Sequence, residues 1–420
     1  MSSVQSVSPM PVGRARVRWT RVGPALFVAT AVAQIDKISI AVVIANAAFL
    51  RTMGLVGHPA VVGALVTAFL AAYGVGLFIW GFLIDALGPR RAAVIAVILW
   101  SVMLAWGGLS TSLGELFASR IGLGLTEGIL FPVCNAFVAR WFPWSERGRA
   151  QSFWFNGATI GAAVGGAVAT ALIVAAGWRA MFLVLAVAGL VIVVPMLWWL
   201  TRDDPDSDPR VSEAERQEIR AQVARPPARP VGEVLRDYRY WLLVLAFTLN
   251  NIFFWGWQSW MPTYLIHARH FSFAAAGGVT ALMFALEVIA VVAMAAATDR
   301  IGRRAWWGAL GFAAAAVGLF VGGHVPALGV GVAIMILGLC GQQASAGNTQ
   351  SLIHSFSDAR SMGKAAGILN AVANLASAFA PALIGAMIGL HSTFSGVLWF
   401  LSLVLLAAAL STALLAPSGY

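Results

Sequence analysis

Charged residues are scarce in this chain: only 10% of its 420 residues are Asp, Glu, Lys or Arg, whereas 60% are apolar. A water-soluble globule of this size needs more polar surface than such a composition supplies. The composition therefore excludes a soluble globular protein and indicates a chain whose solvent is lipid. The 24 Phe, 17 Trp and 43 Gly agree, because aromatic rings settle at membrane interfaces and glycines let spanning helices pack closely.

The usual signatures of catalysis are also missing. The sequence has no Walker-type nucleotide-binding loop, no metal-ligand cluster and no nucleophile triad. We therefore expect neither an enzyme nor a primary pump, and no cofactor or metal. The two cysteines, Cys134 and Cys340, lie in apolar segments and provide no disulfide framework. No cleavable signal peptide is apparent, because the first apolar run is too long and lacks a small-residue cleavage pattern.

Long apolar runs dominate the chain instead. Runs of about 18 to 25 residues predict about twelve membrane-spanning helices. They lie near residues 22–48, 60–84, 92–111, 114–139, 150–175, 178–200, 240–265, 274–297, 305–323, 326–350, 364–389 and 392–415. The predicted fold is an all-α membrane protein of two six-helix halves. Its domains are an N-terminal segment at 1–21, a six-helix bundle at 22–200, a linker at 201–239 and a second six-helix bundle at 240–420.

The positions of the basic residues predict the orientation and account for the formal charge of +10 without nucleic acid. An even number of spans puts both termini on one side of the membrane. Lys and Arg gather in the N-terminus, in the loops at 85–91, 140–149, 201–239 and 298–304, and at Arg360 and Lys364, which share one face. The opposite loops hold only Arg51, Arg179 and Arg269. The positive-inside rule then predicts a multi-pass protein of the cell inner (plasma) membrane with both termini and the linker cytoplasmic.

The linker is the one strongly charged stretch. Ser212 and Glu215 have the spacing of a capping box, which predicts a short surface helix as far as about Val223, where prolines follow. We expect the charges of this helix to be a solvated face rather than a ligand site.

The two halves repeat each other. Asp85-Ala-Leu-Gly88-Pro-Arg90 aligns with Asp299-Arg-Ile-Gly302-Arg-Arg304 at an offset of 214 residues, and Asn156 aligns with Asn370 at the same offset. Gly148-Arg-Ala150 has a counterpart 215 residues later. Matches at nearly one offset indicate a duplicated unit with a pseudo-two-fold axis along the membrane normal.

The first of these stretches, which begins at Gly81, resembles the signature loop of the major facilitator superfamily, with its second copy at Asp299 to Arg304. Pro89 stands where that family prefers a basic residue. Asp85 can pair with arginines or with a helix end of a neighbouring segment. We predict that Asp85, Gly88, Arg90, Asp299 and Arg304 form a gating latch that holds the cytoplasmic side shut in one state. The alternative is loop charge that only sets topology.

Four ionisable residues stand out within the spanning segments: Asp36 and Lys37 in the first, Arg120 and Glu127 in the fourth. Such groups are costly in a membrane and are functional candidates by default. Arg120 and Glu127 are two helical turns apart and face the same way. A site for an anion and protons needs this combination of fixed cations and titratable acids. A purely structural cluster of cancelling charges is the alternative.

The sequence around these residues resembles the anion:cation symporter family within that superfamily. The resemblance lies in Asp36-Lys37-Ile-Ser-Ile-Ala, in Arg120-Ile-Gly-Leu-Gly-Leu-Thr-Glu127 and in Trp141-Phe-Pro-Trp-Ser-Glu-Arg147. It implies proton coupling by Asp36 and Glu127 and substrate binding by Arg120. Lys37 stands where arginine is usual, so it keeps the charge without the forked geometry.

Polar and aromatic residues of the second half offer further contacts. Gln258, Asn370 and Asn374 fall mid-helix and are our predicted substrate-binding partners, suited to a hydroxylated substrate; interhelical hydrogen bonds would explain them equally well. The cluster Phe253-Phe254-Trp255-Gly-Trp257 would instead suit a ring-bearing acid. Glu287 has no counterpart in the family pattern and is either a protonated, hydrogen-bonded acid or an extra cavity contact.

A second set of residues predicts close helix packing and bears on direction of transport. Gly157, Gly161, Gly165 and Gly166 form a small-residue stripe in the fifth span. Drug antiporters usually carry a proline at the place of Ala162, and its absence weighs against export.

The sequence therefore predicts a proton-coupled symporter that takes up a small organic anion, a sugar acid or other carboxylate, by alternating access. Its expected partners are the anion, protons and membrane lipid, not nucleic acid, and we expect a monomer. The alternatives are a proton-coupled exporter of drugs or cations, and a membrane sensor built on the transporter fold.

Overall fold

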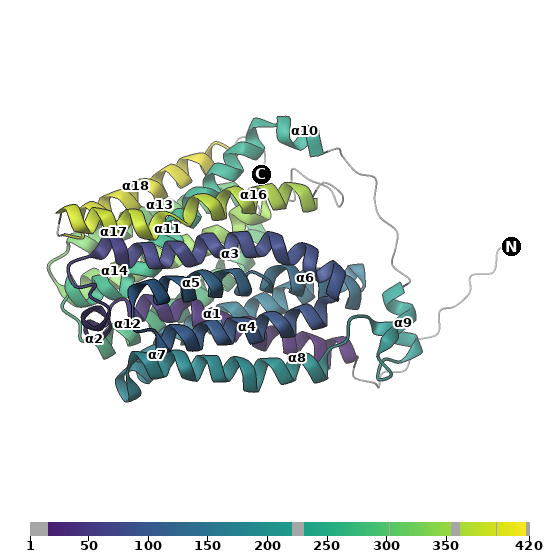
Figure 1. Cartoon of the computed structure of the whole chain (residues 1–420). Helices are drawn as coiled ribbons and strands as arrows, with labels where there is room; N and C mark the ends of the chain where they lie inside the picture. Colours follow the sequence, from purple (N-terminus) through teal and green to yellow (C-terminus); the bar gives the residue numbers. More distant parts are fainter. Residues whose placement is uncertain (1–15, 221–230, 302, 354–361, 392, 417–420) are drawn as a thin grey trace.

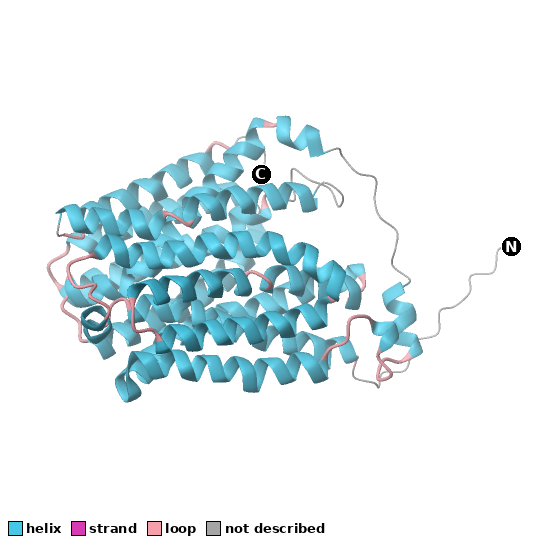
Figure 2. Ribbon diagram, viewed as in Figure 1, coloured by secondary structure: helices cyan, strands magenta, loops and turns pink. Residues whose placement is uncertain are grey.

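The computed structural model describes residues 16–220, 231–301, 303–353, 362–391 and 393–416, and every regular element in these ranges is a helix (Figure 2). The first half contains α1 (Gly23–Val43), α2 (Ala47–Thr52), α3 (Pro59–Leu87), α4 (Pro89–Leu109), α5 (Leu113–Glu127), α6 (Leu130–Trp141), α7 (Trp144–Ala188) and α8 (Val194–Leu200). The linker carries α9 (Glu213–Arg220) and α10 (Val231–Arg236). The second half contains α11 (Tyr238–His267), α12 (Phe273–Ile301), α13 (Arg304–His324), α14 (Leu328–Ser351), α16 (Met362–Ser377), α17 (Ala380–His391) and α18 (Ser395–Ala413).

Twelve crossings follow from these helices. Eleven helical segments of the described chain are long and apolar enough to cross a membrane, and one of them, Ser145–Leu200, has 56 residues. At about 1.5 Å per residue that segment is more than twice as long as a hydrocarbon core of about 30 Å is thick. It turns at Gly177, whose φ of 85° is open to glycine at little cost. The segment therefore crosses twice, and the predicted all-α fold of twelve spans is confirmed.

Local sequence explains the ends of several spans. The short junction after α4 is a true break, because Ser112 caps α5: the Glu115 backbone N–H donates to Ser112 Oγ (3.2 Å). The Glu115 carboxylate accepts in return from the backbone N–H groups of Thr111 (2.7 Å) and Ser112 (3.3 Å). Three polar residues, Thr111, Ser112 and Glu115, thus suffice to separate two apolar helices.

The spans run side by side, so the molecule has two ends (Figure 1). We call the end that carries α9 and α10 the linker end, and the end that carries α2 the far end. Two of the three arginines predicted for the far-end loops satisfy helix carbonyls there. Arg179 donates to Ser110 O (3.0 Å), and Arg269 donates to Val325 O (2.9 Å) and to Gly322 O. Cations at helix C-termini are favourable, so these arginines have a structural role at the far end.

The two halves meet closely at the far end. Helix α3 of the first half packs along α17 of the second and touches α16, which lies toward the linker end, only lightly. A Cβ atom at Gly63 would overlap the backbone of Pro381, and one at Gly385 would overlap the backbone of Pro59. The Ala382 N–H also donates to Thr67 Oγ1 (3.2 Å).

A second contact joins α12 to α7, where a Cβ atom at Gly277 would overlap the side chain of Thr170. Gly277 follows Gly63 by 214 residues, the offset of the internal repeat. The two contacts are therefore related by the pseudo-symmetry of the halves. We call these contacts together the far-end seam.

The glycine stripe of α7 has the predicted packing role. Cβ atoms at Gly157 and Gly161 would overlap the backbone of α1, and one at Gly165 would lie 3.2 Å from Ile35. Gly166 instead faces Thr280 of the second half. Small residues thus bring α7 onto α1 along three turns, which fixes the helix that carries Asp36.

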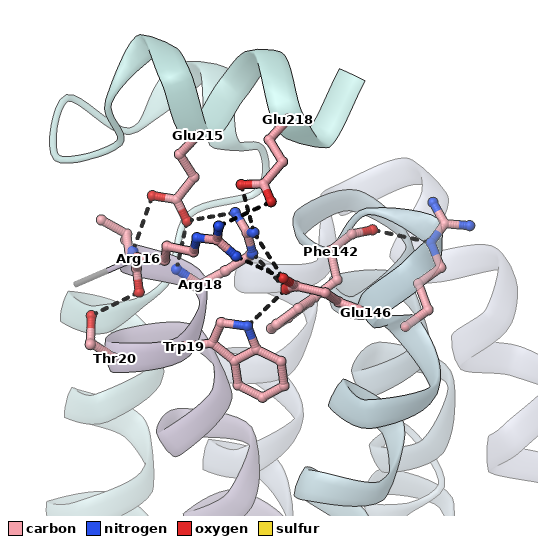
Figure 3. A network of polar contacts seen from close by, with 10 residues as sticks. Arg16, Arg18, Trp19, Thr20, Phe142, Glu146, Glu215 and Glu218 are labelled. Atoms are coloured by element: carbon pink, nitrogen blue, oxygen red, sulfur yellow. Dashed lines mark hydrogen bonds and ion pairs between the residues drawn. The ribbon is translucent and has the colours of Figure 1, made fainter. Parts of the chain in front are cut away.

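At the linker end, α9 is bound to the first half by a network around Arg18, which we call the Arg18 network (Figure 3). The Arg18 side chain is fully buried. Its guanidinium donates to Glu146 of α7 (2.9 and 3.2 Å), to Glu215 (3.2 Å) and to Glu218 (2.9 Å) of α9. Trp19 Nε1 also donates to Glu146 (2.8 Å). One arginine thus joins the start of the first span, the start of α7 and the linker helix.

The expectation of a solvated linker face is wrong for the inner side of α9. Glu215 is buried, and its carboxylate accepts from the backbone N–H groups of Val17 (3.1 Å) and Arg18 (3.3 Å) as well as from the Arg18 side chain. Ser212 does cap α9 as predicted, since the Glu215 N–H donates to Ser212 Oγ (3.2 Å). The helix is described only to Arg220, so its predicted end near Val223 lies outside the described residues.

Candidate functional site

A small pocket lies between the two halves. Its walls are Lys37, Phe69, Leu70 and Tyr73 from the first half and Trp255, Asn374 and Ser377 from the second. The Lys37 ammonium sits over the Tyr73 ring, 3.9 Å from its centroid, and the Tyr73 hydroxyl is buried without a hydrogen-bond partner among the described residues. Ser377 lies where the eleventh span breaks between α16 and α17. The pocket wall thus combines one cation with three aromatic, one aliphatic and two small polar side chains.

Behind Lys37, three charged side chains are buried inside the first half. Asp36 is 1%, Arg120 1% and Glu127 0% exposed. Both carboxylates and the Nε and Nη2 atoms of Arg120 have no hydrogen-bond partner in the described chain. The two acids interact electrostatically with Lys37 and Arg120, yet none of the four groups comes within ion-pair distance of another. Each buried charge without a direct partner lowers the free energy of unfolding by several kcal/mol.

The local structure explains how the four residues come together. Asp36 and Lys37 are neighbours in the sequence, so in α1 their side chains point about 100° apart, Asp36 into the bundle and Lys37 toward the pocket. Arg120 and Glu127 lie on the buried side of α5, and Glu127 is its last residue before the break ahead of α6. Because α5 ends at Glu127 and Gly128 follows, the Glu127 carboxylate lies at the end of a helix.

Arg120 does not line the pocket in this conformation. Its guanidinium carbon lies 4.7 Å from the centroid of the Phe182 ring, within the first half. Direct substrate contact by Arg120 therefore stays a prediction, and Lys37 is the cation at the pocket wall.

Of the three substrate contacts predicted in the second half, one lies at the pocket and two lie away from it. Asn374 lines the pocket. Asn370 is half-buried on the same helix and donates to Ala366 O (2.8 Å), while Gln258 is buried in α11 with its side-chain oxygen unpartnered. Neither Asn370 nor Gln258 is on the pocket wall, so of the three only Asn374 lies at the pocket.

The residues of the predicted latch differ in their surroundings. Gly88 has a φ of 81°, and Arg90 holds the chain after α8: its backbone N–H donates to Asp203 Oδ1 (2.8 Å) and its side chain to Trp198 O (2.6 Å). Asp85 is exposed and has no hydrogen bond or ion pair in the described chain. The Asp299 side chain lies outside the described residues, and Arg304 is exposed. The pairing expected of Asp85 is not made among the described residues in this conformation.

Glu287 belongs to the interior of the second half. It is buried in α12, where it interacts electrostatically with Cys340 of α14, and it is not on the pocket wall. This position is consistent with a structural acid rather than a cavity contact.

The sequence analysis missed three features of this arrangement. Tyr73 was not singled out, although its ring lies directly under the Lys37 ammonium. The Arg18 network joins residues almost 200 positions apart, and no local pattern pairs them. The relation of Gly63 to Gly277 was detectable, because the two glycines have the same offset as the repeated loops.

Comparisons with known proteins agree with this architecture. The family model of the Major Facilitator Superfamily matches residues 26–381. The chain is 30% identical over 296 residues to a probable sulfoacetate transporter of Cupriavidus necator, covering 69% of this chain and 66% of that protein's length. It is 26% identical over 440 residues to a probable galactarate/D-glucarate transporter of Bacillus subtilis, covering 97% and 94%.

Solved structures show the same fold. A bacterial homologue of the human lysosomal transporter Spinster, in an inward-facing and occupied conformation, superposes with a TM-score of 0.77 at 17% identity, covering 97% of this chain and 98% of that one.

Proposed function

The chain belongs to the major facilitator superfamily, and from this premise we propose that it carries a small organic anion into the cell together with protons, by alternating access. The chain is a multi-pass membrane protein and a transporter, not an enzyme. Its relatives named above are described as probable transporters of sulfoacetate and of galactarate and D-glucarate, which supports an organic anion as the cargo.

One observation carries the proposal of proton coupling: Asp36 and Glu127 are buried near Arg120 without hydrogen-bond partners, directly behind Lys37. Protonation would remove the cost of burying each carboxylate, and an arriving anion would compensate the cations that the acids now balance. Coupling then follows, because the loaded protein and the empty protein would each bury little net charge, whereas a half-loaded one would not.

We also propose how the cycle is gated. The far-end seam closes one side of the pocket, and toward the linker end, where α3 touches α16 only lightly, the halves would part. If the linker end lies on the cytoplasmic side of the inner membrane, this conformation is the inward-facing one. Closing the other side would bring Asp85, Gly88 and Arg90 toward the second half, where Asp299 and Arg304 belong to the matching loop. The exposed, unpaired Asp85 supports this assignment.

The test is uptake into proteoliposomes. Purified protein is reconstituted, a panel of labelled carboxylates is supplied outside, and the lumen is set alkaline or equal in pH. We expect at least one carboxylate to be concentrated several-fold only under the proton gradient, with acidification of the lumen during uptake. Accumulation that ignores the gradient, together with no change in luminal pH, would refute symport.

A further inference from the structure

We propose that Glu287 makes closure of the far-end seam depend on protons. Its side chain binds one proton when the seam closes and releases it when the seam opens, both times on the side of the membrane at the far end, which we call the far side. The transported protons of the proposed function are assigned to Asp36 and Glu127, so this role is a different one. It rests on the proposed function only in that the two ends must open in turn.

Glu287 lies on the face of α12 that meets the first half. Gly277 belongs to the far-end seam, and Thr280 on the same face meets Gly166 of α7. Phe284 and Glu287 continue this buried stripe at helical spacing. Glu287 is ten residues beyond Gly277, about 15 Å along the axis toward the linker end. It therefore lies just beyond the seam.

The internal repeat relates Glu287 to a residue at the pocket. Glu287 follows Tyr73 by 214 residues, the offset that also relates Gly277 to Gly63. Tyr73 therefore has the place in α3 that Glu287 has in α12, ten residues beyond a glycine of the seam. Tyr73 lies on the wall of the pocket between the halves. Pseudo-symmetry thus puts Glu287 at the depth of the pocket, on the matching side of the interface.

The surroundings of Glu287 do not suit a carboxylate in this conformation. The side chain is 6% exposed, and α12 packs on α14, α7 and α11. Cys340 of α14 is the titratable group that interacts with it electrostatically, and no charged side chain in the described parts of those three helices does so. An isolated buried carboxylate is strongly disfavoured, so the acid holds its proton while the seam is closed.

Opening of the seam changes these surroundings. Parting α12 from α7 lets water from the far side reach this face of α12. A hydrated glutamic acid ionises at neutral pH, so Glu287 would release its proton there and would have to bind one again before the seam closes. One proton linked to closure lowers the ratio of closed to open protein by up to about ten-fold for each unit by which the far-side pH rises. Acid on the far side therefore favours the closed seam.

The experiment measures opening of the seam in intact cells, where the far side is predicted to face outward. In protein with both native cysteines replaced by alanine, Ser377→Cys at the pocket reacts with a membrane-impermeant maleimide, without added substrate, at an external pH of about 5.5 or about 7.5. Each rate is divided by the rate of the same protein carrying Glu287→Gln, which cancels the pH dependence of the thiol itself. We expect this ratio to rise at least ten-fold from the lower to the higher pH.

Two further variants identify the carboxyl group as the cause. Glu287→Asp keeps a titratable acid on the same face of α12 and should preserve the rise. Glu233→Gln is the matched control, because Glu233 is exposed on α10 at the linker end, and it should also preserve the rise. A ratio that stays constant with pH would overturn the inference, even if Glu287→Gln changes the rate equally at both pH values.

Uptake into proteoliposomes separates this role from the proposed function. Glu287→Gln should still concentrate a carboxylate under the proton gradient, because a proton bound and released on one side is not transported. Loss of accumulation in this variant would make Glu287 a proton carrier and would overturn the one-sided role. If the native protein concentrates no carboxylate while the labelling ratio rises with pH, the proposed function is wrong and the proton-linked closure stands.

Discussion

The buried carboxylates of the first half are the residues on which transport energetics depend. Asp36 and Glu127 are surrounded by apolar side chains of α1, α3 and α5 and have cations nearby without direct bonds to them. An arrangement selected only for stability would pair such charges directly, since breaking a buried pair costs about 3–5 kcal/mol. Groups left unpaired are free to change partner and protonation during a cycle.

Amide variants of the two acids test this directly. We expect both Asp36→Asn and Glu127→Gln to abolish proton-driven accumulation, because neither amide binds or releases a proton at the pH values used for uptake. Exchange of labelled for unlabelled substrate across the vesicle membrane, without a gradient, should survive in at least one of them. Uptake into proteoliposomes and counterflow are the two measurements. Concentrative uptake with luminal acidification in both variants would show that neither residue carries the proton.

The cations allow a second residue-level prediction. Lys37→Gln should raise the half-saturating substrate concentration at least ten-fold, about 1.4 kcal/mol or more, because the pocket wall loses its cation. Lys37→Arg should retain transport, since it keeps the charge and adds paired donors.

Arg120→Ala should abolish transport while the protein still purifies as a monodisperse species. Near-native binding by Arg120→Ala in detergent would remove Arg120 from the substrate site.

Among the elements, the linker helix α9 has the clearest mechanical assignment. The Arg18 network binds it to α1 and α7, all within the first half, so α9 should move with that half during the cycle. Arg18→Ala would leave Glu215 without its cation, and Glu146 and Glu218 with the exposed Arg16 as their remaining cation. We expect α9 to detach, and trypsin to cleave at Arg216 and Arg220 at least ten-fold faster in the purified protein.

Arg220→Ala serves as the matched control for that experiment. Within the described ranges, Arg220 forms an ion pair with exposed Asp206 alone (2.7 Å), a surface pair of a kind that contributes about 0–1 kcal/mol. Cleavage at Arg216 should keep its native rate in this variant. If Arg18→Ala also leaves the cleavage rate unchanged, the network does not hold the helix.

The helices themselves could be predicted from the sequence far better than their docking. Apolar length located every span within a few residues, and the Ser212 cap was predicted from its spacing to Glu215. The Ser112 cap has the same spacing to Glu115 and was not predicted. Buried charges such as Asp36 stood out because lipid makes them expensive. The partners of Arg18 could not be predicted, since α9 looks like an ordinary solvated helix until tertiary packing buries Glu215. The pocket wall also required the structure, because Tyr73 and Trp255 are two aromatic residues among many.

For the whole molecule, orientation is the first property to test. In a protein with both native cysteines replaced by alanine, Asp206→Cys places an exposed thiol at the linker end and Val56→Cys places one at the far end. The bias of basic residues predicts that a membrane-impermeant maleimide added to intact cells labels Val56→Cys only. Asp206→Cys should react after the cells are opened. The reverse pattern would invert the orientation and the inward-facing assignment with it.

The far-end seam gives a second test at this scale. Gly63→Leu puts a side chain where α3 meets Pro381, so the seam should no longer close and the pocket should open to the far side. In the same cysteine-free protein, Ser377→Cys at the pocket should then react with the impermeant maleimide from the far side at least ten-fold faster. Gly74→Leu is the control, because nothing lies within 4 Å of a Cβ at that position of α3. Equal reactivity in the two variants would mean that this contact does not seal the pocket.

The residues of that seam also bear on how the transporter responds to membrane voltage. Gly63, Pro381, Gly277 and Thr170 carry no charge, and the hydrogen bond from Ala382 to Thr67 is between neutral groups. Parting them moves no protein charge through the transmembrane field, which acts with about 2.3 kcal/mol per elementary charge for each 100 mV. Any electrical work in the cycle must then be done on the cargo and on charged groups outside the seam, such as Asp36, Arg120 and Glu127. The net charge moved per substrate under voltage clamp would therefore equal the number of protons carried minus the negative charges of the anion, without a contribution from the opening of the seam.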